Sequence, residues 1–251
     1  MRTRIERMKV CVNGGRDGGD HPGIPLTPAE LTVSAAEAVA AGAEAVHMHP
    51  RDGSGAESLA AADIAAAVTA VRHRCPGVTI GVSTGLWITR GDPRARSAEV
   101  AGWASLPVAS RPDFASVNVS EPGWPELCGQ LSAAGIGAEA GVWSVDDAYT
   151  LVAGTGTVDW LRILVEVIDS SEAGAAAAAD EILSCLGEVP AAVPRLLHGE
   201  GPSCWPLIAY AGWLGIATRV GLEDTLAGPD GFPVTSNADL VSLALPIWSH
   251  H

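Results

Sequence analysis

Two histidines one residue apart end a short apolar run in the stretch AVHMHPRDGSG. Residues i and i+2 of a β-strand point to the same face, so His47 and His49 can offer two imidazole nitrogens to one divalent ion. Catalytic zinc usually has three protein ligands and an open position for water or substrate. We predict Glu223, at the end of another β-rich run, as the third ligand. The alternative is a hydrogen-bonded histidine pair at a sheet rim, with Glu223 paired to Arg51 or Arg219.

The elements that must position these side chains alternate along the chain. Short β-rich runs predict strands over residues 8–14, 44–50, 79–85, 114–120, 137–143, 160–167, 195–200 and 217–223. Longer alanine-rich stretches predict helices over residues 27–41, 59–74, 93–105, 124–134, 145–153, 172–187, 204–214 and 237–247.

Eight strand–helix units in 251 residues are typical of the α/β class and of the (β/α)8 TIM barrel. We therefore predict a single (β/α)8 barrel domain over residues 1–251. The last strand then adjoins the first, which brings Glu223 close to His47 and His49. A doubly wound open sheet is the competing fold, but it usually has fewer units, and no GxGxxG turn follows the first predicted strand.

Helix start signals support these boundaries. In LTPAEL, Thr27 is a predicted cap, Pro28 takes the first helical position, and Glu30 completes a capping box. The last helix has Ser236 or Asn237 as its cap.

Polar residues share one face of several predicted strands and become more frequent toward the strand ends. Arg219 and Glu223 share a face of the last strand, and Glu166 and Asn118 lie on the corresponding faces of two others. The C-terminal ends of the strands are where such barrels carry their active sites. Because unpaired buried polar groups are costly, this inward-facing set predicts a bound metal or substrate, and hence an enzyme.

The composition narrows the possible partners and location. A net charge of −14 opposes binding to nucleic acid phosphates, and no apolar run reaches the length of a membrane span. The five scattered cysteines fit reduced thiols, so we expect a cytoplasmic protein. We also expect a homo-oligomer, either a tetramer or a dimer.

The motifs together resemble a known family. The stretches PLTPAEL, HMHPRDGSG, GVSTG, SVNVS and TRVGLEDT occur in that order along nearly the whole chain. They resemble the β-keto acid cleavage enzymes, whose best-known member is the 3-keto-5-aminohexanoate cleavage enzyme, and this chain looks like a divergent short member.

The resemblance implies a metal-dependent (β/α)8 enzyme that converts a β-keto acid and acetyl-CoA into a new acyl-CoA and acetoacetate. It implies that Zn2+, or another divalent ion, is bound by His47, His49 and Glu223. It also implies that Asp224 is the catalytic acid/base and that Arg219 holds negative charge. The substrate-binding residues that it implies are Ser83, Thr84, Gly85 and Asn118.

Two positions depart from the family's pattern. Where the family often has TGAE, this chain has NGGRDGG, so Arg16 stands at an acidic position. Where the family often has an ExE pair, AEAGVW keeps Glu139 but has Gly141 as the second residue. We predict that Glu166 supplies a carboxylate instead, that Arg16 binds substrate, and that the substrate carries an anionic group where relatives bind an amine.

Other readings stay open. One is a zinc-dependent keto-acid lyase or aldolase that does not use CoA, and another is a non-catalytic barrel that binds a metabolite. His198 and Glu200 end one predicted strand, and Trp87 and Trp143 follow two others. Each of these four residues either contacts substrate or serves packing.

Overall fold

The computed structural model describes residues 4–154, 156, 158–168 and 170–250. Its strands form a closed barrel in which each strand pairs in parallel with the next and β8 pairs with β1. The strands are β1 (Met8–Cys11), β2 (Ala45–Met48), β3 (Thr79–Ser83), β4 (Phe114–Asn118), β5 (Gly137–Val142), β6 (Trp160–Val167), β7 (Arg195–Gly199) and β8 (Ala217–Val220). The predicted (β/α)8 barrel is confirmed.

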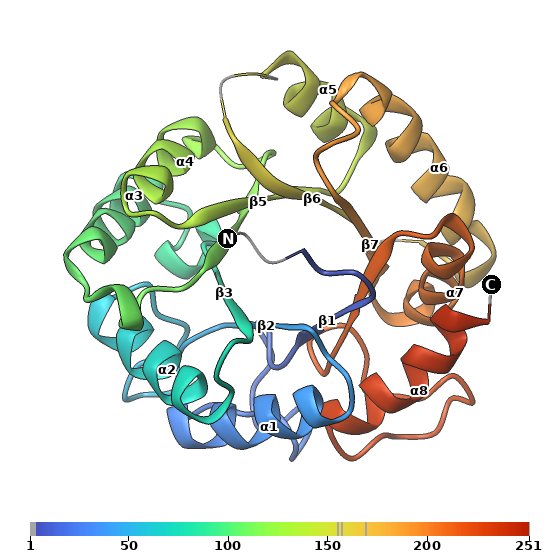
Figure 1. The fold of residues 1–251 in the computed structure, drawn as a ribbon, viewed down its shortest axis with the longest axis horizontal. Coiled ribbons are helices and arrows are strands. Elements are labelled where there is room, and N and C mark those ends of the chain that lie inside the picture. The colour runs from blue at the N-terminus through green and yellow to red at the C-terminus, as the bar shows by residue number, and fades with distance from the viewer. Residues whose placement is uncertain (1–3, 155, 157, 169, 251) are drawn as a thin grey trace.

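A ring of helices surrounds the sheet, as Figure 1 shows in a view down the barrel. The helices are α1 (Pro28–Ala40), α2 (Ala61–Arg74), α3 (Pro93–Gly102), α4 (Trp124–Ala133), α5 (Val145–Ala153), α6 (Ala175–Cys185), α7 (Cys204–Leu214) and α8 (Asn237–Ser249). The outward-facing strand residues, such as Val10, Val46 and Val117, are fully buried in the main apolar core. No helix within the described residues is both long and apolar enough to cross a membrane.

Most strands end earlier than the sequence predicts, because the chain turns away from the sheet before the polar residues that follow. β1 ends at Cys11 and β8 at Val220, so Glu223 lies in the turn after β8. The predicted helix over 172–187 is shorter as well, since separate 3-10 turns flank α6 on both sides.

The predicted helix caps are present. The Glu30 amide donates to Thr27 Oγ1 at 3.3 Å, and Glu30 Oε2 accepts from the Thr27 amide at 2.9 Å, which completes the capping box. Ser236 caps α8 by accepting from the Asp239 amide at 3.1 Å. Asn237 is not the cap, and its side chain donates to the Val12 carbonyl at 2.9 Å.

The barrel interior is layered. A small apolar cluster, which includes Ile5 and Leu164, fills the end where the strands begin. Above it, Glu139 pairs with both Lys9 and Arg162, and all three side chains are almost completely buried. Burial raises the pKa of Glu139, but the two cations outweigh it and lower the pKa to about 2. This charged layer supports the polar site above it.

Candidate active site

The two histidines and Glu223 meet at the end of the barrel where the strands finish. His47 lies in β2, His49 follows it, and β1 separates β2 from the β8 turn that carries Glu223. The His47 and His49 Nε2 atoms are 3.3 Å apart, and His49 Nε2 is 3.7 Å from Glu223 Oε2. One ligand atom from each residue lies within 4.8 Å of the others. The structure therefore brings together the three predicted metal ligands.

The protonation of these groups suits a cation. The His49 Nδ1 atom is 2.6 Å from Glu57 Oε1, and because a carboxylate only accepts, Nδ1 is the nitrogen that donates there while Nε2 faces the cluster. Burial lowers the pKa of His47 well below its usual value, which keeps that imidazole neutral. Burial alone would raise the pKa of Glu223, but the Arg219 guanidinium beside it outweighs burial, and the pKa is lowered to about 2. The Glu223 Oε2 atom is buried and has no hydrogen-bond partner within the described part of the chain. These lone pairs fit a divalent metal ion.

Arg219 connects the triad to two further carboxylates. Its Nη2 atom donates to Glu223 Oε1 at 3.0 Å and to Asp224 Oδ1 at 2.8 Å, and Nε donates to the same Asp224 oxygen at 3.1 Å. Its Nη1 atom lies 3.5 Å from Glu166 Oε2. Asp224 is fully buried, and burial raises its pKa well above the usual value even though Arg219 opposes the shift.

Glu166 is held from both sides. Its Oε1 accepts from Trp143 Nε1 at 2.9 Å, and its Oε2 is 2.9 Å from His198 Nε2. Burial raises the pKa of Glu166, but Arg219 and His198 lower it to about 2. Burial, reinforced by Arg219, lowers the pKa of His198 to about 4. Glu166 is therefore a fixed carboxylate and His198 a neutral imidazole at neutral pH.

Gly141 makes room for this carboxylate. A Cβ atom at this position would lie 2.4 Å from Asn118 Oδ1 and 2.9 Å from Glu166 Oε1. Real Cβ atoms do not approach other atoms that closely. The glycine that the sequence has in place of a second acid thus allows Glu166 and Asn118 to face the same space.

These side chains surround a cavity of about 450 Å3. The predicted site residues that line it are Arg16, His47, His49, Ser83, Asn118, Glu166, Arg219 and Glu223. Arg16 donates from Nε to the Glu223 carbonyl at 3.2 Å, and no described carboxylate lies within ion-pair distance of its guanidinium. Arg16 is therefore a cavity cation without a direct ion pair among the described residues, although the Glu200 carboxyl in the same cavity interacts with its charge.

Three predicted residues lie behind the cavity wall. Asp224 is covered by Arg219, and Thr84 donates to the Ser116 carbonyl at 2.5 Å. Gly85 packs so closely against the Trp87 ring that a Cβ there would lie 2.3 Å from the indole. Of the GVSTG turn, only Ser83 lines the cavity, and its hydroxyl accepts from the Gly85 amide at 3.1 Å.

Sequence reasoning missed several residues of the site. Glu57 belongs to a loop and contacts His49 across eight positions, and no strand or helix period indicates such a pairing. Asp20 lines the cavity from the long β1–α1 segment. Trp87, Trp143 and Glu200, for which packing was the alternative role, also line the cavity.

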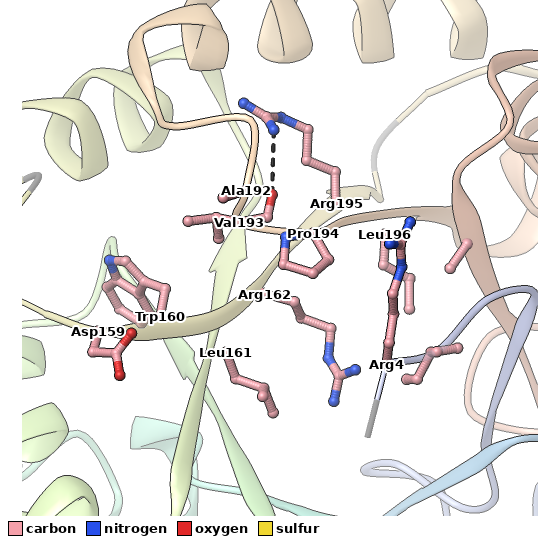
Figure 2. Close-up of a pocket in the computed structure, with 12 residues that line it drawn as sticks. Arg4, Asp159, Trp160, Leu161, Arg162, Ala192, Val193, Pro194, Arg195 and Leu196 are labelled. Carbon is pink, nitrogen blue, oxygen red and sulfur yellow. Dashed lines mark hydrogen bonds between the residues drawn. The ribbon is translucent and has the colours of Figure 1, made fainter. Parts of the chain in front are cut away.

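A second cavity, of about 330 Å3, lies at the opposite end of the barrel. Figure 2 shows it beside β6 and β7, with Arg162 and Arg195 among its lining residues. Arg195 donates to backbone carbonyls, including Val193 at 3.3 Å, and Arg162 pairs with Glu139. The cluster of described residues that could hold a metal ion lies at the other end, so this second cavity is not the candidate active site.

Comparison with known proteins agrees with the geometry. The family model described as beta-keto acid cleavage enzyme matches residues 8–250. The chain is 24% identical over 257 residues to the 3-keto-5-aminohexanoate cleavage enzyme of Acetoanaerobium sticklandii, covering 96% of this chain and 90% of that protein.

Two solved structures of ObcA have the same fold. The apo structure has a TM-score of 0.67 at 20% identity, covering 88% of this chain but only 61% of ObcA. The ternary complex of ObcA with a C4-CoA adduct and oxalate has a TM-score of 0.66 at 20% identity, covering 88% of this chain and 63% of ObcA. At this identity the likeness establishes the barrel fold.

Proposed function

Because this chain belongs to the beta-keto acid cleavage enzyme family and is therefore an enzyme that cleaves β-keto acids, we propose that it does so with Zn2+ and acetyl-CoA. His47, His49 and Glu223 hold the ion. The bond between the keto carbon and the CH2–COO⁻ group breaks. The acyl group joins CoA, and the CH2–COO⁻ group joins the acetyl group to form acetoacetate. The convergence of three possible ligand atoms, one of them a buried carboxylate oxygen that no described residue hydrogen-bonds, carries this proposal.

The metal would act as a Lewis acid that stabilises negative charge on the substrate's keto oxygen. The residues around the ion bind and orient the substrate. Arg219, which lines the cavity beside Glu223, attracts the substrate carboxylate or the charge that develops on it. The Ser83 hydroxyl and Asn118 line the same cavity and orient the substrate by hydrogen bonds.

Asp224 and Glu166 have different parts in proton transfer. Asp224 has an Oδ2 atom without a hydrogen-bond partner among the described residues and a raised pKa, so it is the proposed proton carrier, and because it lies behind Arg219 it exchanges a proton with the substrate only when that guanidinium moves aside. Glu166 has a lowered pKa and stays ionised, so it orients donors on the substrate and does not carry protons at neutral pH.

The substrate has a second anionic group. Arg16 supports this, because it lines the cavity without a carboxylate partner among the described residues. A guanidinium can bind a carboxylate through two parallel hydrogen bonds, and this pairing is strong where water is partly excluded. Trp87 and Trp143 line the same cavity and provide apolar contact for the chain between the two charged ends.

A keto-acid lyase or aldolase that does not use CoA is the second candidate. Only residues 168–171 separate β6 from the 3-10 turn Glu172–Gly174, which leaves little chain there to recognise a CoA. The ObcA complex with a C4-CoA adduct supports the CoA-dependent reaction on this fold.

The test joins metal content to product analysis. Zinc is measured in purified wild type, His47→Ala and Glu223→Ala, and each protein is incubated with mono- and dicarboxylic β-keto acids, with and without acetyl-CoA. We expect about one zinc per chain in wild type only, and acetoacetate plus acyl-CoA only when acetyl-CoA is present. Products without acetyl-CoA would favour the lyase. If the wild type bound no zinc and formed no products, the result would favour the non-catalytic barrel that binds a metabolite.

The family assignment does not determine the oligomeric state. We propose that the protein is a homo-oligomer, either a tetramer or a dimer. Three large apolar side chains on the α7–α8 side support it, since Trp213, Phe232 and Leu243 are all substantially exposed. Light scattering of the purified protein measures its mass directly.

A further inference from the structure

Glu57 lies next to one metal ligand without belonging to the ligand cluster. It ends the loop that follows His49, where Arg51 and Glu57 form an antiparallel bridge. Its side chain is mostly buried, and its Oε1 atom is 2.6 Å from His49 Nδ1. This is the nitrogen that points away from the ligand cluster. Glu57 therefore sets which His49 nitrogen carries the proton.

Trp87 holds Glu57 in turn. Its indole Nε1 donates to Glu57 Oε2 at 3.0 Å, and its ring stacks on the His49 ring with centroids 6.3 Å apart and planes 23° apart. The close approach of this indole to Gly85 leaves no space for a side chain there. Loops after β2 and β3 thus meet on the outer side of His49.

His47 has no equivalent support. Its Nδ1 atom is buried and has no hydrogen-bond partner among the described residues, and its ring instead stacks on Phe114. The two histidine ligands therefore differ, and His49 is the one whose orientation depends on a carboxylate.

We propose that Glu57 is a positioning residue that fixes His49 for metal binding, and that Trp87 keeps Glu57 in place. The inference rests on the proposed metal site. Glu57 accepts a hydrogen bond from the His49 Nδ1–H. This leaves the Nε2 lone pair free for the ion and makes Nε2 a stronger electron-pair donor to the metal. Loss of such a partner typically weakens metal affinity by about 10- to 100-fold.

A carboxylate is required because it must accept two hydrogen bonds. The His49 Nδ1–H and the Trp87 Nε1–H both donate to Glu57, one to each oxygen. A glutamine at this position has one acceptor oxygen, and its NH2 group would face a second donor. Glu57→Gln therefore either loses one of the two bonds or keeps both only when His49 accepts at Nδ1 and carries its proton on Nε2, which removes the lone pair that faces the ion.

The experiment measures zinc affinity by competition with a chelating dye for wild type, Glu57→Gln, Trp87→Phe and Asp52→Asn. Asp52→Asn is the matched control, since it removes one charge from the same loop and keeps the Oδ1 acceptor that binds the Ser54 and Ala56 amides. We expect about 10- to 100-fold weaker binding for Glu57→Gln, a smaller loss for Trp87→Phe, and wild-type affinity for the control.

A second readout separates positioning from general damage. Nitrogen-15 NMR of the metal-free protein reports the His49 tautomer, which we expect to be Nδ1–H in wild type and mixed in Glu57→Gln. If Glu57→Gln does not fold, Trp87→Phe gives the test, because phenylalanine keeps the ring stacking. Wild-type affinity and tautomer in both variants would overturn the inference while the metal site stands. Failure of the wild type itself to bind zinc would overturn the proposed function first.

Discussion

Gly141→Ala tests whether the shape of the site is as important as its charges. The added Cβ would lie 2.4 Å from Asn118 Oδ1 and 2.9 Å from Glu166 Oε1, where ordinary contact begins at about 3.4 Å. Neither neighbour is free to move. Asn118 donates to Glu121 at 3.0 Å, and Glu166 is bonded to both Trp143 and His198.

The overlap of about 0.5 to 1 Å must therefore shift the carboxylate or the amide. Overpacking of this kind typically costs about 1–3 kcal/mol of stability. A misplacement of about 1 Å among catalytic groups can cost about 100-fold in rate, which corresponds to about 2.7 kcal/mol of transition-state stabilisation. We expect kcat/KM for the β-keto acid to fall about 100-fold. The corresponding loss of about 2.7 kcal/mol in transition-state stabilisation lies near the upper end of the range of about 1–3 kcal/mol expected for the loss of folding stability.

The assays are steady-state kinetics and urea unfolding on the same preparations. Gly129→Ala in α4 is the control, because a Cβ there meets no atom within 4 Å and alanine favours the helix by about 0.5–1 kcal/mol. This control should keep full activity and gain slight stability. Wild-type kcat/KM in Gly141→Ala would show that Glu166 and Asn118 do not act from the positions described, and would refute the reasoning.

Further predictions concern charge and metal. Glu139→Gln should lose about 3–5 kcal/mol in urea unfolding, since it leaves two buried cations unpaired. Because the pKa of Glu139 is about 2 when folded and near 4.5 otherwise, its contribution is present above pH 4.5 and is lost as pH falls toward 2, so the stability difference between wild type and Glu139→Gln should narrow between pH 4.5 and pH 3 and vanish only below about pH 2. Arg16→Gln should raise KM about tenfold for a dicarboxylic β-keto acid and leave KM for a neutral analogue unchanged; equal effects on both would remove Arg16 from substrate recognition. Chelation should abolish activity and lower Tm, and added zinc should restore both, whereas full activity in the chelated protein would exclude a catalytic metal.

Local patterns predicted most of the fold because they depend on near neighbours. The capping box at Thr27 and Glu30 formed as predicted, since both partners lie within one helical turn. The strand boundaries were less accurate. The polar residues beyond Cys11 and Val220 continue the period of a strand, yet they belong to the loops that build the site.

The sequence by itself determined that His47 and His49 face the same way, since that follows from strand geometry, and the barrel topology then brought Glu223 near them. Only the tertiary structure decided that Glu57 supports His49, that Gly141 leaves space for Glu166, and that Asp224 lies behind Arg219. The Glu57 and Asp224 contacts span only eight and five residues, but they lie in loops, whose paths have no sequence period, and the Gly141 contact joins separate strands. They are decided by which side chains can share a packed interior without leaving a buried charge or donor unpaired.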